Sequence, residues 1–172
     1  CAEAIEAALA VLEALPSSPA LMITYRTKAL LALADADDDR AISLAEEALA
    51  VAEALADPSV IGSALEGVGL CWLGRDLARA CDYLERSLTL QREAQAVFRC
   101  ASVCANLGSV YSEQYRFADA ERVLREGIAL ATEHDLDRLL AFMEGWRAWM
   151  WMHQGRWAEA FELAEQSLQR AA

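Results

Sequence analysis

Residues 101–131, ASVCANLGSVYSEQYRFADAERVLREGIALA, contain the pattern that decides the fold. Small and apolar residues recur at helical spacing on both sides of a short turn. Those before the turn are Ala101, Cys104, Leu107, Gly108 and Tyr111, and those after it are Ala120, Leu124 and Ile128. The stretch therefore predicts two antiparallel helices whose small and apolar faces pack against each other.

The same pattern recurs along the chain at a nearly constant period. An alanine close to the predicted turn appears at Ala41, Ala80, Ala120 and Ala160, which gives a period of about 40 residues. In addition, EAALAVLEAL at 6–15 overlays EEALAVAEAL at 46–55, one period later. Self-similarity at a fixed period is typical of helical repeats, and here it predicts that the chain opens on a lone second helix.

The composition also favours helices. The 172 residues are 56% hydrophobic and 24% charged, are rich in Ala and Leu, and include only 3 prolines. These values predict an all-α fold with a sizeable core in one helical-repeat domain over residues 1–172. Because the chain begins at Cys1 in mid-repeat, we expect it to be a fragment of a longer protein. The approximate repeats are 1–16 (partial), 19–56, 58–94, 96–134 and 136–172.

The helix pair in residues 101–131 resembles a tetratricopeptide (TPR) repeat. Leu107, Gly108, Tyr111, Ala120 and Leu124 stand where this family has Leu, Gly, Tyr, Ala and a large apolar residue. The resemblance implies a TPR-like right-handed superhelix of antiparallel helix pairs, with seven to eight helices and a repeat period of about 40. It also implies that the first helix of each pair lines a concave groove.

Capping signals place the ends of the helices. Ser18-Pro19 and Asp57-Pro58 combine an N-cap with a proline at the first helical position, and the acidic turn at 35–39 favours a helix start. Gly74 and Gly155 are predicted to end helices as C-terminal glycines. We expect turns near 35–39, 74–76, 114–117 and 154–157.

Charge and cysteine content exclude several kinds of partner. The net charge of −12, with Lys28 as the single lysine, would repel a phosphate backbone, so no nucleic acid is expected to bind this segment. No apolar run approaches a membrane span and no leader is visible, so we expect a cytoplasmic protein without a membrane partner. Cys100 and Cys104 lie one helical turn apart, but no CxxC motif or histidine accompanies them. We therefore predict no metal site. Cys71 and Cys104 occupy repeat positions that face inward, and we expect their thiols to serve as small apolar groups.

No catalytic motif is present. The sequence lacks a GxxxxGK[ST] loop, an HExxH motif, a GxSxG elbow and a dinucleotide fingerprint. His134 and His153 lie in different predicted helices, with no acid and nucleophile at a suitable local spacing. We predict no enzyme activity, no catalytic residue and no cofactor.

The TPR resemblance places candidate groove residues on the first helix of each pair. They are Glu66, Trp72, Asn106, Ser109, Glu113, Phe142, Trp146, Trp149 and His153. The last four follow i, i+4, i+7, i+11 spacing and form one stripe. Three interpretations stay open: the stripe lines a groove that binds a ligand, which we favour; it packs in the core; or it is exposed only because a neighbouring repeat or a second subunit is missing. Glu144 and Arg147, three residues apart, have the spacing of an ion pair.

The second half of the chain carries a further resemblance. Residues 126–168 are similar to the helical-repeat region of large ATP-binding LuxR-type, MalT-like transcription regulators. The matching features are EHDLD at 133–137, Trp146-Arg147-Ala148, and Gly155-Arg156-Trp157 followed by Glu159-Ala160. This resemblance implies a sensor module of a transcription regulator that binds a small effector or a protein partner and that can self-associate. The alternatives are a structural spacer or oligomerisation scaffold, and a peptide-binding adaptor.

Overall fold

The computed structural model describes residues 2–170 and forms two compact units, divided between Ala94 and Gln95. Within this described range the chain has nine α-helices and no β-strand, which confirms the all-α prediction. The count exceeds the expected seven or eight, because an isolated first helix precedes four complete pairs. We expected the whole chain to form one continuous domain. Whether the two units join in this way stays a prediction.

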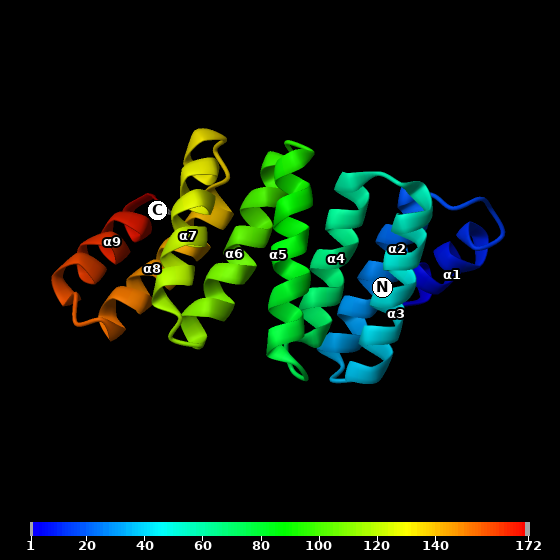
Figure 1. Ribbon diagram of the computed structural model, residues 1–172, viewed down its shortest axis with the longest axis horizontal. Coiled ribbons are helices and arrows are strands. Elements are labelled where there is room, and N and C mark those ends of the chain that lie inside the picture. The colour runs from blue at the N-terminus through cyan, green and yellow to red at the C-terminus, as the bar shows by residue number, and fades with distance from the viewer. Residues whose placement is uncertain (1, 171–172) are drawn as a thin grey trace. The chain divides into compact units, whose positions relative to one another are not determined.

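The first unit consists of one single helix and two helix pairs (Figure 1). Helix α1 packs on α2, the pairs are α2 with α3 and α4 with α5, and α4 also contacts both α2 and α3. The helix bounds are α1 Ala2–Leu12, α2 Pro19–Ala34, α3 Asp38–Leu55, α4 Pro58–Trp72 and α5 Leu77–Glu93.

The second unit consists of two helix pairs, α6 with α7 and α8 with α9 (Figure 1). Helix α8 packs on both α6 and α7 and so joins the two pairs. The bounds are α6 Val97–Glu113, α7 Phe117–Glu133, α8 Asp137–His153 and α9 Trp157–Arg170.

The predicted helix starts are confirmed by their capping geometry. The Ser18 side chain accepts a hydrogen bond from the Leu21 backbone N–H. Asp57 accepts from the backbone N–H groups of Ser59 and Val60. Asp37, from the acidic turn, caps α3, and Asp76 caps α5. These side chains satisfy N–H groups that have no partner within the helix.

The helix ends agree only in part with the glycine signals. Gly155 has a φ of 77°, as expected for a C-terminal glycine, but Gly74 does not adopt a left-handed conformation. The other left-handed positions are non-glycine residues, namely Ala36, Ala56, Gln95, Tyr115 and Asp135. Gln95, Tyr115, Asp135 and Gly155 follow one another at equal intervals of half a repeat. Each helix together with its turn therefore occupies half a repeat.

Small residues let the helices of a pair approach closely, as the alanine period predicts. Ala41, Ala80 and Ala120 are fully buried, and Ala160 is 3% exposed. A Cβ atom added at Gly108 of α6 would overlap the Leu124 side chain of α7. The packed helix pair therefore needs a residue without a side chain at this position.

The prediction that Cys71 and Cys104 face inward is confirmed, because both thiols are free and buried. Cys81 and Cys100 are also free and buried, whereas Cys1 lies outside the described residues. Burial raises the pKa of the Cys71 thiol to about 11, so this group stays uncharged and packs as a small apolar side chain. Among residues 2–170, no helix is both long and apolar enough to traverse a bilayer.

Candidate interaction surface on α8

Helix α8 has two apolar faces. Leu140, Met143 and Met150 are buried on one of them, at 8%, 0% and 1% exposure. The other face carries the predicted stripe of Phe142, Trp146, Trp149 and His153. A helix that is apolar on two sides either lies in a core or keeps one face for a partner.

The rings of the stripe contact one another in sequence. The ring centroids are 6.3 Å apart for Phe142 and Trp146, 5.7 Å for Trp146 and Trp149, and 3.8 Å for Trp149 and His153. Tyr115, from the turn between α6 and α7, extends the row, with centroids 6.0 Å from Trp149 and 5.7 Å from His153. We call these five residues the aromatic ladder.

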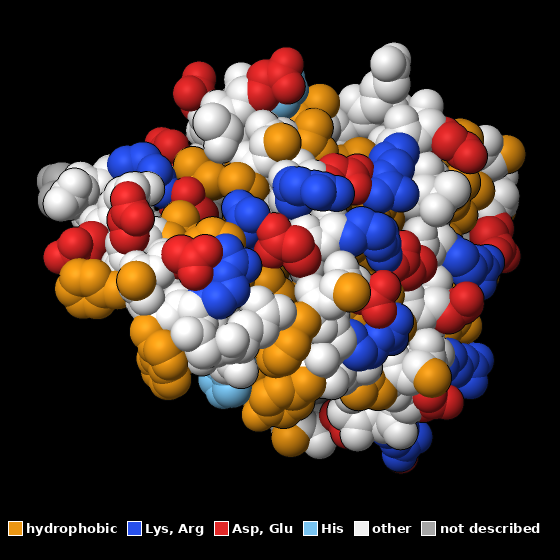
Figure 2. All heavy atoms as spheres, turned by 60° about the vertical axis from the view of Figure 1, so that its left-hand side comes forward, with side chains coloured by type: hydrophobic (Ala, Val, Ile, Leu, Met, Phe, Trp, Pro, Cys, Tyr) orange, Lys and Arg blue, Asp and Glu red, His pale blue; other side chains and the backbone are white. Residues whose placement is uncertain are grey.

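The aromatic ladder is partly open to solvent. Phe142 is 47% exposed and Tyr115 is 61% exposed. Trp146 and Trp149 are half-buried, and His153 is exposed. Figure 2 shows hydrophobic side chains on both sides of a histidine at the lower edge of the molecule. Each indole thus keeps area that a bound partner would cover.

A backbone hydrogen bond fixes the orientation of His153. Its Nδ1 lies 2.9 Å from the carbonyl oxygen of Trp149, one turn earlier in the helix. Because a carbonyl oxygen only accepts, Nδ1 donates the proton, and Nε2 is left as a hydrogen-bond acceptor. The imidazole therefore adds one polar site to an otherwise apolar row.

The predicted residues of α6 lie in the same unit as the ladder. Asn106 and Ser109 are half-buried, and Ser109 donates a hydrogen bond of 2.8 Å from its hydroxyl to the Asn106 backbone carbonyl. Glu113 is exposed in the last turn of α6, shortly before Tyr115. The second unit thus offers polar groups on α6 and aromatic rings on α8, two helices that pack together.

The other two predicted residues belong to the first unit and contact neighbours within it. Glu66 is buried at 3% exposure, and its carboxylate pairs with the Arg26 guanidinium at 3.3 Å. The guanidinium of Arg79 lies 4.0 Å from the ring centroid of half-buried Trp72. The carboxylate of Glu66 and a face of the Trp72 ring are therefore already in contact with arginines of the same unit.

The predicted pairing of Glu144 with Arg147 is wrong. Arg147 forms its ion pair with Glu121 of α7 at 2.5 Å, and Glu144 pairs with Arg170 of α9. Both partners come from neighbouring helices, and spacing within one helix does not reveal them. The ring of Trp151 lies near the guanidinium groups of Arg147 and Arg156, which are 4.7 Å and 4.3 Å from its centroid.

Tyr115 is the ladder residue that the sequence pattern did not identify. It lies outside the helices, in the turn before α7, and its left-handed φ of 57° belongs to its role as a turn residue. Its position one repeat before Gly155, which fills the equivalent turn, was the available signal. An aromatic residue where the next repeat places a glycine indicates a role for the side chain.

Comparison with known proteins agrees with this architecture. The tetratricopeptide repeat model matches residues 100–134 and 147–172. A search of curated protein sequences gives no match. The chain therefore contains TPR-like repeats, a class that generally serves as a non-catalytic scaffold for protein–protein interaction.

Solved structures share the fold. One is the set of nearly identical TPR-like repeats of a Podosopora anserina protein described as a kinesin light chain, with a TM-score of 0.71 and 15% identity over 97% of this chain and 83% of that one. A variant of the same protein gives a TM-score of 0.74 at the same identity and coverage. BtubC (BKLC) from P. vanneervenii gives a TM-score of 0.72 and 20% identity over 90% of this chain and 63% of that one. At these identities the likeness shows the fold alone.

Proposed function

We propose that the chain is a TPR-like interaction module that docks a protein partner on the aromatic ladder. The observation that carries this proposal is the half-exposed row of rings on α8, the first helix of its pair. Tryptophan and tyrosine dominate the binding energy of many interfaces, because they bury a large rigid surface at a small cost in conformational entropy. Asn106, Ser109 and Glu113 are the proposed polar contacts beside the ladder.

The charge of the chain defines the kind of partner segment. The net charge of −12 favours encounter with a basic partner, and an arginine or lysine side chain is attracted to the face of an exposed indole. We therefore propose a peptide segment that combines apolar side chains with arginine or lysine. Glu66 and Trp72 stay predictions for the first unit, and a cytoplasmic location is part of the same proposal.

The decisive experiment selects ligands from a library of random peptides displayed on phage, using the whole chain as bait. Trp146→Ala should abolish enrichment of the peptides selected by the unchanged protein while costing little stability, because a half-exposed ring gains most of its burial energy in the complex. Phe98→Ala, which removes a 57% exposed ring elsewhere on the second unit, is the matched control and should leave enrichment unchanged.

A Trp146→Ala variant that is strongly destabilised but still selects the same peptides would assign the ladder to the core. If Trp146 is mainly a packing residue, its replacement by alanine should cost about 3–5 kcal/mol in unfolding free energy and leave peptide selection as before. Acrylamide quenching of tryptophan emission gives an independent reading, because rings that are open to solvent are quenched and core rings are protected.

The similarity of residues 126–168 to LuxR-type regulators supports one further hypothesis, that the module senses a small effector within a transcription regulator. A ligand that binds only the folded state raises the apparent melting temperature. A thermal-shift screen of the chain against sugars, amino acids and short peptides tests this hypothesis. Stabilisation by a sugar or an amino acid, lost in Trp146→Ala, would favour a sensor over a protein-docking module.

A further inference from the structure

Helix α6 carries two charged residues, and both are placed against its own dipole. Arg99 is the third residue of the helix and Glu113 is the last. A helix has a partial positive charge at its N-terminus and a partial negative charge at its C-terminus, so a cation in the first turn and an anion in the last turn are both unfavourable. Natural chains depart from such local preferences mainly at functional sites.

Arg138 repeats this arrangement on α8, where it is the second residue. The helical rotation of about 100° per residue places Arg138 about 40° from Phe142, on the same face as the aromatic ladder. Asp137, the other charged residue of this turn, lies about 140° from Phe142 and so belongs to a different face. The ladder is thus extended at its start by a cation.

The three charges share one surface with the ladder. Helices α6 and α8 pack together and run in the same direction (Figure 1). Tyr115, just after α6, contacts His153 at the end of α8, so the C-terminal ends of the two helices lie together. We call the ladder, Arg138 and the α6 stripe the groove surface. The α6 stripe, at spacings of three and four, is Arg99, Ser102, Asn106, Ser109 and Glu113. The groove surface is therefore cationic at one end and anionic at the other.

These charges are not used within the chain. Among residues 2–170, no ion pair or side-chain hydrogen bond engages Arg99, Arg138 or Glu113. Other arginines of the second unit do pair with carboxylates, namely Arg116 with Asp119, Arg147 with Glu121 and Arg156 with Glu159. Arg138 and Glu113 are exposed, and Arg99 is half-buried. All three can therefore pair with charges on a partner.

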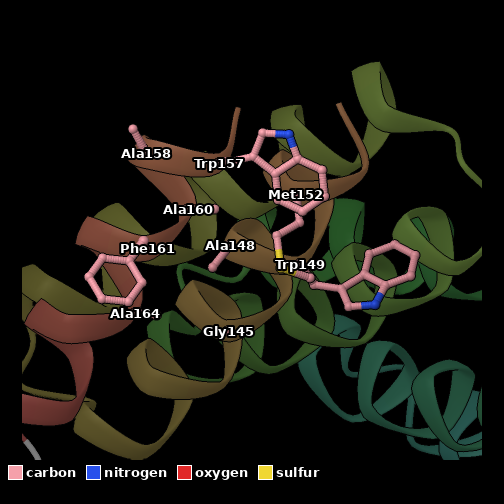
Figure 3. A pocket seen from close by; sticks show the side chains of 9 residues that line it. All are labelled: Gly145, Ala148, Trp149, Met152, Trp157, Ala158, Ala160, Phe161 and Ala164. Carbon is pink, nitrogen blue, oxygen red and sulfur yellow. The ribbon is translucent and has the colours of Figure 1, made fainter. Parts of the chain in front are cut away.

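The groove surface lies on the α6 side of α8. Trp149 borders an apolar cleft of about 670 Å³ between α8 and α9. Its ring nevertheless points away from Phe161 and Ala164 of α9 (Figure 3) and contacts Tyr115, at a centroid distance of 6.0 Å. Two of the three charges are on α6, which packs against α7 and α8, so their position does not depend on a segment beyond α9.

We infer that the groove surface selects a partner segment whose own charges differ at its two ends. An acidic residue faces Arg99 and Arg138, apolar side chains lie on the ladder, and an arginine or lysine faces Glu113. The segment binds in one direction only, because the reverse direction would bring like charges together. Arg99 and Glu113 are about 21 Å apart along the helix, which an extended segment covers in about six residues. This inference rests on the proposed function and adds the charge pattern of the partner.

Reversing the charges of the bait in the phage selection tests the inference. The unchanged protein should enrich peptides with Asp or Glu about six residues from Arg or Lys. The double variant Arg99→Glu with Arg138→Glu should select a basic residue in place of the acidic one, and Glu113→Lys should select an acidic residue in place of the basic one. Either bait should enrich the original peptides about tenfold less. Because each reversal suits the helix dipole, the variants should keep or raise the melting temperature.

Arg125→Glu and Glu165→Lys are the matched controls. They reverse exposed charges on the second helices α7 and α9 and should leave the selected charges unchanged. Reversed baits that select the same charges as the unchanged protein overturn the inference, and so does a clear loss of melting temperature in both reversed baits. Peptides that need Trp146 but show no charge pattern would contradict this inference alone. If no peptide depends on Trp146, the proposed function fails and this inference fails with it.

Discussion

Several helix ends depend on single residues held in a left-handed conformation. Ala36, Ala56, Gln95, Tyr115 and Asp135 have φ values between 51° and 59°. For a residue with a Cβ atom this conformation costs about 1–2 kcal/mol. The chain accepts this cost because the left-handed residue turns the backbone within a short turn and so keeps the even spacing of the helices.

Replacing Ala56 by glycine should stabilise the protein. Glycine adopts positive φ without steric cost, and after its greater freedom in the unfolded state is counted the expected gain is about 0.5–1 kcal/mol. Urea denaturation followed by circular dichroism measures the change. Ala50→Gly, at an exposed position inside α3, is the control and should instead lose about 0.5–1 kcal/mol. Equal losses in both variants would contradict the left-handed assignment.

The left-handed residues also show where prediction from sequence fails. Gly155 was identified because glycine is the residue that left-handed backbone favours. Ala36 and Gln95 carry no such signal in their residue type, and Tyr115 carries one only through its position one repeat before Gly155. Gly74 has the residue type that left-handed backbone favours, but it does not adopt that conformation.

Among the helices, α8 combines the most roles. Its buried face enters the interface with α6 and α7, its aromatic stripe faces outward, and its Ala148 and Gly145 line the cleft toward α9. The stripe could be predicted because all four residues lie on one helix at fixed spacing. Tyr115 and the ion pairs of Glu144 and Arg147 could not, because they depend on how separate helices are placed in space.

The close approach of α7 and α8 makes a specific prediction. An alanine at Gly127 would bring a Cβ atom to 2.7 Å from the Cβ of Cys104, and it would also overlap Met143. We expect Gly127→Ala to lower the unfolding free energy by about 1–3 kcal/mol through overpacking. Thermal unfolding followed by circular dichroism measures this loss.

Gly145 provides the control for this prediction. No atom lies within 4 Å of a Cβ added there, so Gly145→Ala should be neutral or should gain up to about 1 kcal/mol from helix propensity. If Gly127→Ala were equally well tolerated, the tight contact between α7 and α8 would be refuted.

Along the chain, the alanine period predicted more of the fold than the aromatic stripe predicted of the candidate site. The regular spacing of buried alanines established helix pairs before any contact was known, because packing two helices closely requires a small residue at the same place each time. Of the residues that line the apolar cleft between α8 and α9, only Trp149 was among the predicted site residues. The other lining residues are small or apolar types that also occur in helix packing, so their residue types alone did not indicate a cleft.

The division into two units predicts local responses to mutation. The stability of a repeat array is approximately a sum of neighbouring contacts, so damage should stay near its origin. Ala120 is fully buried in the second unit, and Ala120→Leu should overpack it by about 1–3 kcal/mol. Hydrogen exchange measured by mass spectrometry should show faster exchange in residues 95–170 and little change in residues 2–94. Uniform acceleration along the chain would instead indicate one cooperative unit.

The packing partners of each helix also have a consequence for folding during synthesis. The main contacts of every helix are with helices one or two places away in the chain, so no packed pair in either unit needs a segment more than about one repeat distant. Such low contact order predicts rapid folding. During synthesis α2 and α3 would find each other while the ribosome is still translating later repeats, and the growing chain would expose little unpaired apolar surface at any moment.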